Sequence, residues 1–314
     1  MEVTVYTTVD QVFSEPVLRN FERQSGIHVK ALFDTEEAKS TGVLNRLLAE
    51  KDNPQCDVFW SGDPLRAHIL KVKGISQPYG SPIAADINQY FKDNDRHWTG
   101  FSARARVLIY NKNLLAPKDL PHSIFDLADP KYKNRVVIAN PLFGTTSFHF
   151  AALFSVLDRE KAEQFLTALK RNGVLIVPSN SDVRKHVAAG ESFCGITDTD
   201  DAFEAQKQDQ ATGMVFLDQN DGEIGTLIIP NTVSLIKHSP HPENGKRLMD
   251  YLLSTETEAK LAVSCAQMPL HKGVQTPPDV PSLDVIKPMA VDYDEAANML
   301  EQILPYLKQW TEQR

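Results

Sequence analysis

Strand patterns and helix patterns alternate along most of this chain, and this alternation limits the fold more than any other feature. Short apolar runs at residues 3–6, 27–33 and 57–60 are separated by segments of helical periodicity. A second series of the same kind runs from about residue 103 to residue 208. Strands that alternate with helices form mostly parallel sheets with helices on both faces. We therefore expect an α/β fold.

The length of the chain predicts two domains, since 314 residues correspond to two domains of roughly 150 residues each. The strand at 228–236 follows the whole second series, which indicates a return to the first domain. We expect a discontinuous lobe 1 (1–102 and 231–271), a lobe 2 (103–230), and a C-terminal helical segment (272–314) that packs on the lobes.

Charge and cysteine content exclude several classes of function. The net charge is −8 and the pI is near 5.6, which argues against nucleic-acid and anionic-membrane partners because both require a basic face. Cys56, Cys194 and Cys265 lie far apart and form no metal-binding or redox spacing, although one disulfide remains open. No apolar run reaches the roughly 18 residues of a membrane span. Met1 runs directly into a strand pattern, so the protein is either cytosolic or has its signal peptide replaced by Met1.

Polar residues gather in the loops that follow the predicted strands. These loops cover residues 7–10, 34–37, 61–63, 140–147 and 198–201. Open α/β sheets bind their ligands at the carboxyl ends of the strands. We therefore expect the ligand-binding residues in these loops.

The segment Gly144–Ser147 opens a helix directly after a strand. Such a position can be an anion-binding site, because it offers free backbone N–H groups, hydroxyls and the positive end of the helix dipole. Capping of the helix by its own Thr or Ser side chains is the alternative. If the hydroxyls bind an anion, replacing Thr145 and Thr146 by Val weakens binding and leaves the stability of the free protein nearly unchanged.

Several charged residues allow two interpretations. Asp198, Asp200 and Asp201 can bind a metal or an ammonium group, or can complement the dipole of the following helix. Arg104 and Arg106 alternate on one face of an apolar strand, where they can clamp a carboxylate or phosphate or can pair with an acid inside the protein.

Motifs of catalysis are missing from the sequence. There is no Gly-x-Ser-x-Gly, His-Glu-x-x-His or Gly-x-Gly-x-x-Gly. His149 lies two residues beyond Ser147, and such positions on a helix point apart. We expect a protein that is not an enzyme and that carries no cofactor.

Four segments occur in an order that is typical of one family: VYTT at 5–8, FERQSGIHV at 21–29, DVFWSGD at 57–63 and PENGKRLMDYLLS at 242–254. Together they resemble the extracellular solute-binding proteins of ATP-driven (ABC) importers, most closely the ferric-iron-binding branch. The resemblance covers about residues 3–270.

The resemblance implies a two-lobed periplasmic-binding-protein fold, in which crossover strands act as a hinge and the lobes close on a small solute. It implies a periplasmic or extracellular protein whose signal peptide has been removed. It also implies a membrane permease as the partner of a monomeric binding protein.

The resemblance indicates the family more specifically than it indicates the ligand. The iron binders hold the metal with two adjacent tyrosines, a His and a Glu. No two tyrosines are adjacent in this chain, and the loop that corresponds to the tyrosine pair is 197–201. The His position is filled by about Asp10, and the Glu position by Gly62 or Asp63. A small anion that bears a phosphate or phosphonate fits the remaining residues better. The expected ligand-binding residues are Thr8, Asp10, Glu36, Trp60, Ser61, Asp63, Arg104, Phe143, Gly144, Thr145, Thr146, Ser147, Asp198 and Asp200. The alternative is iron or another metal, held with a synergistic anion by Asp10, Asp63 and Asp198.

Overall fold

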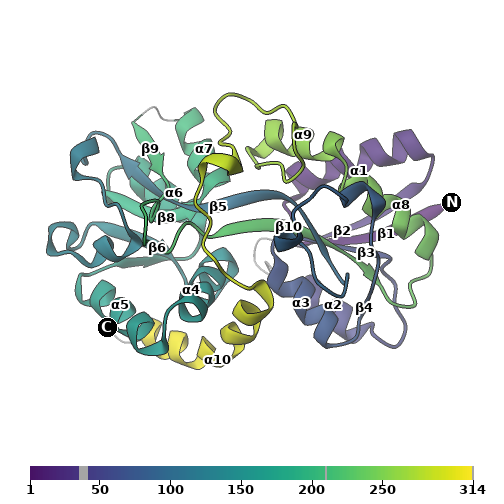
Figure 1. The fold of residues 1–314 in the computed structure, drawn as a ribbon, viewed down its shortest axis with the longest axis horizontal. Helices are drawn as coiled ribbons and strands as arrows, with labels where there is room; N and C mark the ends of the chain where they lie inside the picture. The colour runs from purple at the N-terminus through teal and green to yellow at the C-terminus, as the bar shows by residue number, and fades with distance from the viewer. Residues whose placement is uncertain (35–41, 209–210, 313–314) are drawn as a thin grey trace. The chain divides into compact units, whose positions relative to one another are not determined.

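The computed structural model describes residues 1–34, 42–208 and 211–312, and the chain divides into two compact units (Figure 1). Unit 1 comprises Met1–Ala103 and Ile229–Leu283, and unit 2 comprises Arg104–Ile228 and Asp284–Arg314. Both units are α/β, as the sequence predicts. Within the described residues, no helix is long and apolar enough to cross a membrane.

The sheet of unit 1 is built on a central parallel strand. Strand β1 (Glu2–Thr7) pairs in parallel with β2 (His28–Phe33) and with β3 (Val58–Ser61). Strand β10 (Ile228–Ile236) runs antiparallel to β3 and to the short β4 (Ser76–Gln77). The carboxyl ends of β1, β2 and β3 therefore lie at the same edge of the sheet.

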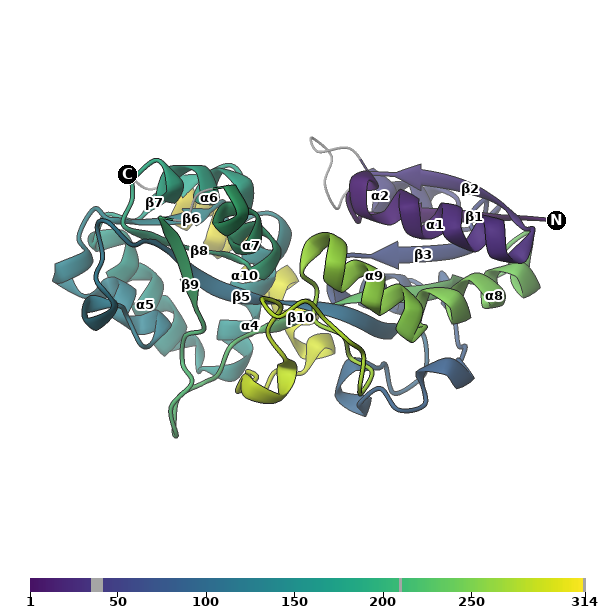
Figure 2. The same ribbon diagram turned by 90° about the horizontal axis from the view of Figure 1, so that it is seen from above.

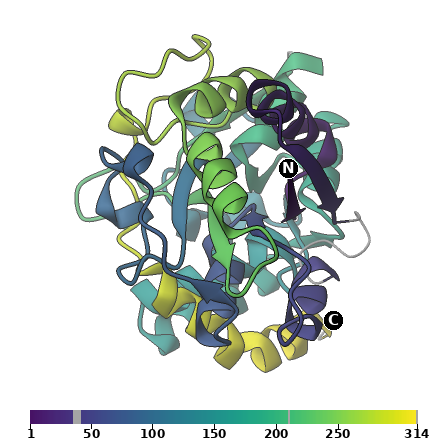
Figure 3. The ribbon, with the colours of Figure 1, turned by 90° about the vertical axis from the view of Figure 1, so that its right-hand side faces the viewer.

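Helices cover both faces of this sheet (Figures 1 and 2). One face carries α1 (Gln11–Ser25), α8 (Pro242–Leu252) and α9 (Thr255–Cys265), and the other carries α2 (Gly42–Ala49) and α3 (Pro64–Val72). Tyr6 and Phe59 pack with Leu47 and Leu70 on the α2 and α3 side. Figure 3 turns this unit toward the viewer, with the N-terminus at the start of β1.

Unit 2 repeats the scheme. Strand β6 (Val136–Ala139) is parallel to β7 (Leu175–Val177) and β8 (Cys194–Asp198), while β5 (Thr99–Asn111) is antiparallel to β8 and to β9 (Thr212–Val215). The helices are α4 (Gly144–Val156), α5 (Arg159–Arg171), α6 (Asn180–Ala188), α7 (Thr199–Gln208) and α10 (Tyr293–Glu312).

The helices of unit 2 form two layers (Figure 1). Apolar residues of α6 and α7, among them Val183 and Ala202, pack on Val107 and Val137 of the sheet. Helices α4, α5 and α10 cover the opposite face. In this layer the Trp310 indole N–H donates to the Leu166 carbonyl at 2.9 Å.

Short 3₁₀ helices lie in the connections: η1 (Pro82–Ala84), η2 (Gln89–Phe91), η3 (Pro117–Asp119), η4 (Ile124–Ala128), η5 (Pro130–Tyr132) and η6 (Leu283–Val285).

The strands predicted at residues 3–6, 27–33, 57–60 and 228–236 are confirmed within one residue at each end, as β1, β2, β3 and β10. Helix α1 ends at Gly26, which adopts a φ of 68° as a left-handed cap. Helix α3 was not predicted, because residues 61–64 indicate only a turn. The Asp63 carboxylate nevertheless accepts the N–H of Arg66 at 3.3 Å, and Pro64 occupies the first turn, which are recognised helix-start signals.

Candidate functional site

Five polar residues of unit 2 meet at the carboxyl edge of its parallel strands. Arg106 lies on β5 opposite Asp198, which ends β8. Thr145 and Thr146 begin α4, the helix that follows β6, and Asn180 begins α6, the helix that follows β7. The topology brings these elements to one edge because β6, β7 and β8 run in parallel.

A dense network of hydrogen bonds connects these side chains, which we call the Arg106 cluster (Arg106, Thr145, Thr146, Asn180, Asp198). Nη1 of Arg106 donates to Asp198 Oδ1 at 2.6 Å and to Thr145 Oγ1 at 3.1 Å, while Nη2 donates to Thr146 Oγ1 at 3.2 Å. The Thr145 hydroxyl donates to Asp198 Oδ2 at 2.7 Å, and the Asn180 amide donates to Thr145 Oγ1 at 2.8 Å. Arg106 is only 3% exposed, so this is a buried ion pair.

The internal pairing of the two arginines is confirmed. Arg104 also lies near the same carboxylate, with Nε 3.4 Å from Asp198 Oδ2. Asp198 thus neutralises part of the positive charge that a ligand anion would otherwise meet. Asn180 was not predicted, because a lone Asn before a helix reads only as a possible cap.

The hydrogen bonds of Thr145 and Thr146 argue against the expectation that Val at both positions leaves stability nearly unchanged. Both hydroxyls are buried and hydrogen-bonded within the cluster. Their removal leaves the Asp198 carboxylate and the Arg106 guanidinium short of partners, which costs free energy of folding.

The first turn of α4 offers backbone donors. Ser147 donates its N–H to the Phe143 carbonyl at 3.2 Å, but the N–H groups of Gly144, Thr145 and Thr146 have no acceptor among the described residues. Such orphan groups are normal for a helix start and attract anions. Gly144 has a φ of 58°, with no atom within 4 Å of where a Cβ would stand. Phe143 beside it is 58% exposed.

Three carboxylates lie together at the start of α7. Oxygens of Asp198, Asp200 and Asp201 all lie within 4.8 Å of one another. Burial raises the pKa of Asp201 to about 7, and the neighbouring charges of Asp200 and Asp198 act in the same direction. The Thr197 and Ser181 hydroxyls lie 3.3 and 3.4 Å from its carboxylate oxygens. The group is therefore partly protonated near neutral pH, and a cation placed beside it would favour the charged form.

His149, on α4, belongs to the interior of unit 2. Burial, together with the nearby Arg106, lowers its pKa well below the usual value. A neutral imidazole fits this buried position beside the Arg106 guanidinium.

The predicted residues of unit 1 lie at the carboxyl edge of its own sheet. Thr8 Oγ1 accepts the N–H of Gly62 at 2.9 Å, and Ser61 Oγ accepts the N–H of Asp63 at 3.3 Å. The Asp63 carboxylate forms an ion pair with Arg66. This edge is ordered by its own hydrogen bonds, and the Asp63 charge is already balanced.

The remaining predicted residues have different surroundings. Asp10 is exposed and precedes α1 without a side-chain cap bond. Trp60 is fully buried, with its ring centroid 5.6 Å from that of Phe101. Glu36 lies outside the described residues. The three cysteines are buried free thiols.

The comparisons with known proteins agree on one kind of protein. The family described as bacterial extracellular solute-binding protein matches residues 17–287. Iron uptake protein A1 of Synechocystis sp. is 26% identical over 306 residues, covering 94% of this chain and 82% of that protein. A periplasmic protein of Salmonella paratyphi A, named for binding 2-aminoethylphosphonate, is 28% identical over 264 residues, covering 82% of this chain and 74% of that protein.

Solved structures share the fold over nearly the whole chain. Iron-bound HitA of Pseudomonas aeruginosa has a TM-score of 0.87 at 22% identity, covering 98% of this chain and 99% of that one. The apo ferric ion-binding protein A of Pasteurella haemolytica has a TM-score of 0.86 at 25% identity, covering 99% of this chain and 98% of that one. These similarities establish the two-lobed periplasmic-binding-protein fold.

Proposed function

Because this chain belongs to the family of bacterial extracellular solute-binding proteins, we propose that it captures a small solute that carries a phosphate or phosphonate group and an amine or hydroxyl group. It then delivers this solute to the permease of an ABC importer. It acts by binding and not by catalysis. The observation that carries the proposal is the first turn of α4, where three backbone N–H groups have no acceptor among the described residues.

The anionic end of the solute is assigned to these donors. Gly144 brings no side chain to this turn, so that an oxygen of the ligand can approach the backbone closely. The Thr145 and Thr146 hydroxyls are held by Arg106 and Asp198. We therefore assign them the role of fixing the turn, with the backbone N–H groups as the direct donors.

The amine end is assigned to the carboxylates at the start of α7. Asp200 and Asp201 are adjacent to Asp198, and Asp201 gains negative charge when a cation binds because its pKa is about 7. A solute with an ammonium group matches this pair. The relative named for 2-aminoethylphosphonate supports this chemistry.

Ferric iron or another metal, held with a synergistic anion, is the second candidate. The carboxylate oxygens of Asp198, Asp200 and Asp201 are spaced within 4.8 Å, and relatives are named for iron. However, both Asp198 oxygens already accept hydrogen bonds from Arg106 and Thr145, and Asp63 is paired with Arg66. These pairings reduce the carboxylate charge that Fe³⁺ needs, and they favour the organic anion.

The mode of action follows the family. We propose that lobe 1 (1–102 and 231–271) and lobe 2 (103–230) close on the solute by a hinge motion, with 272–314 packing on them. Thr8, Asp10, Ser61 and Asp63 are the proposed contacts from lobe 1, whereas the fully buried Trp60 is assigned to the packing beneath them. We further propose a periplasmic monomer without nucleic-acid partners. Compaction in solution scattering on addition of the solute tests the hinge.

Calorimetric titration separates the two ends of the ligand. We expect 2-aminoethylphosphonate to bind at least tenfold more tightly than ethylphosphonate, which lacks the amine. The Asp200→Asn variant is expected to lose most of that preference, whereas Glu160→Gln, an exposed acid on α5, keeps it. Absence of binding by both phosphonates, together with stoichiometric ferric binding, would instead support the metal.

A further inference from the structure

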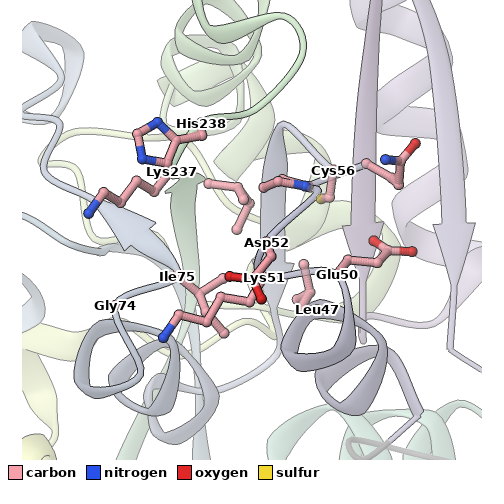
Figure 4. Close-up of a pocket in the computed structure, with 12 residues that line it drawn as sticks. Leu47, Glu50, Lys51, Asp52, Cys56, Gly74, Ile75, Lys237 and His238 are labelled. Carbon is pink, nitrogen blue, oxygen red and sulfur yellow. The ribbon is translucent and has the colours of Figure 1, made fainter.

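Unit 1 contains a cavity of about 200 Å³ at the edge of its sheet opposite the loops that carry Thr8 and Asp63 (Figure 4). Its wall is formed by the end of α2 and the following turn, the residues before β3, the turn between α3 and β4, and the residues at the end of β10. Cys56, which precedes β3, marks this edge, whereas Asp63 follows β3. The cavity is therefore separate from the predicted ligand contacts of this unit.

The inner part of the cavity is apolar. Leu47, Cys56, Ile75 and Ile236 all line it, and all belong to the hydrophobic core on the α2 and α3 side of the sheet. Burial raises the pKa of the Cys56 thiol well above its usual value, so this residue contributes a neutral, apolar surface. Each of these side chains is at most 3% exposed, so together they form a closed apolar wall that can contact the apolar body of a ligand but holds little water for it to replace.

The rim of the cavity is charged. Lys51 and Lys237 are exposed, and their ammonium groups have no hydrogen-bond or ion-pair partner among the described residues. In Figure 4 both ammonium ends lie at the left side of the view, with the Asp52 carboxylate between them and Glu50. Glu50 is engaged elsewhere, since Tyr6 Oη donates to it at 3.0 Å and Arg46 Nε at 2.7 Å.

We propose that this cavity is a second binding site, for a small amphipathic monoanion. Its anionic head lies between Lys51 and Lys237, and its short apolar body lies on Leu47, Ile75 and Ile236. A volume of about 200 Å³ corresponds to about seven waters at roughly 30 Å³ each, which is the size of a six-carbon carboxylate. Among the described residues that line the cavity, Asp52 is the one acid whose side chain has no partner, and it lowers the affinity for the anion.

The test is a titration of the ¹⁵N-labelled full chain with hexanoate, and in parallel with 1-hexanol as the uncharged analogue. Hexanoate is expected to shift the amide signals of Leu47, Gly74, Ile75 and Lys237 in a saturable way. It is expected to bind at least tenfold more tightly than 1-hexanol. Saturable shifts confined to other regions, such as the first turn of α4, or equal affinity for both probes, would overturn the proposal.

Variants make the assignment specific. The double variant Lys51→Met, Lys237→Met keeps the apolar stems and is expected to lose at least tenfold in hexanoate affinity, with 1-hexanol binding unchanged. Asp52→Asn is expected to tighten hexanoate binding about threefold. The control is Lys272→Met, an exposed lysine of unit 1 that does not line the cavity. If Lys272→Met weakens hexanoate binding as much as the double variant does, the effect is one of net charge and the assignment is wrong.

Discussion

The Arg106 cluster of unit 2 and the rim of the unit 1 cavity both combine basic and acidic side chains, but they differ in how the charges are satisfied. In the cluster, the guanidinium and the carboxylate are buried and bound to each other and to two hydroxyls. On the rim, the Lys51 and Lys237 ammonium groups are exposed and have no partner among the described residues.

The difference separates a structural role from a binding role. A buried charge that loses its partner is costly, since the remaining ion stays desolvated. An exposed ammonium group is solvated, and losing it costs little. The cluster is therefore expected to govern stability and to hold the α4 turn in place, whereas the rim is expected to govern only the binding of an anion.

The largest expected effect is that of Arg106→Met. This variant leaves Asp198 buried with one remaining basic neighbour, Arg104, and we expect a loss of about 3–5 kcal/mol in the free energy of unfolding. Urea denaturation measures it. Adding Asp198→Leu is expected to restore part of the loss, because the unpaired charge is removed. A loss below about 1 kcal/mol in the single variant would contradict the structural role.

The next effect concerns the two threonines. Thr145→Val with Thr146→Val removes hydroxyls that serve Asp198 and Arg106, and we expect a loss of about 1–3 kcal/mol in stability. Solute affinity is expected to fall at least tenfold because the α4 turn shifts. Thermal unfolding and calorimetry measure the two quantities on the same samples. Weaker binding at unchanged stability would mean that the hydroxyls contact the solute directly.

A third prediction uses the pH dependence of Asp201. Its pKa is about 7 in the folded protein, against an ordinary value of 3.8 for an aspartate. Between these values the unfolded chain releases the proton and the folded chain keeps it, so this group lowers stability as the pH rises from about 4 to 7. Asp201→Asn cannot titrate. Its stability relative to the parent is therefore expected to increase across this pH range by about 4 kcal/mol, which is about three pKa units at roughly 1.4 kcal/mol each. A difference that is flat with pH would contradict the raised pKa.

The smallest expected effect is at the rim. Lys51→Met and Lys237→Met are each expected to change the free energy of unfolding by less than about 0.5 kcal/mol. Denaturation of both variants beside Lys272→Met checks this. A loss comparable to that of Arg106→Met would show that these lysines have partners in solution, and the comparison between the two regions would no longer hold.

The sequence predicts the fold far better than the site. The strand–helix alternation identifies β1, β2, β3 and α1, because apolar periodicity reports burial directly. It also identifies the loops at the strand ends. The sequence pattern leaves open whether Arg106 faces a ligand or an acid of the protein. The answer depends on the register of β5 against β8, which places Arg106 opposite Asp198. No local pattern in the sequence indicates the role of Asn180 or the unit 1 cavity. The partners of Asn180 and the residues that line the cavity come from segments distant in the chain.

Native mass spectrometry of the metal-free protein, mixed with equimolar 2-aminoethylphosphonate and ferric citrate, tests the proposed solute most directly. The account predicts a colourless one-to-one complex with the phosphonate and no iron adduct, because paired tyrosines are absent from the sequence. A one-to-one iron adduct that absorbs visible light, with no bound phosphonate, would contradict it.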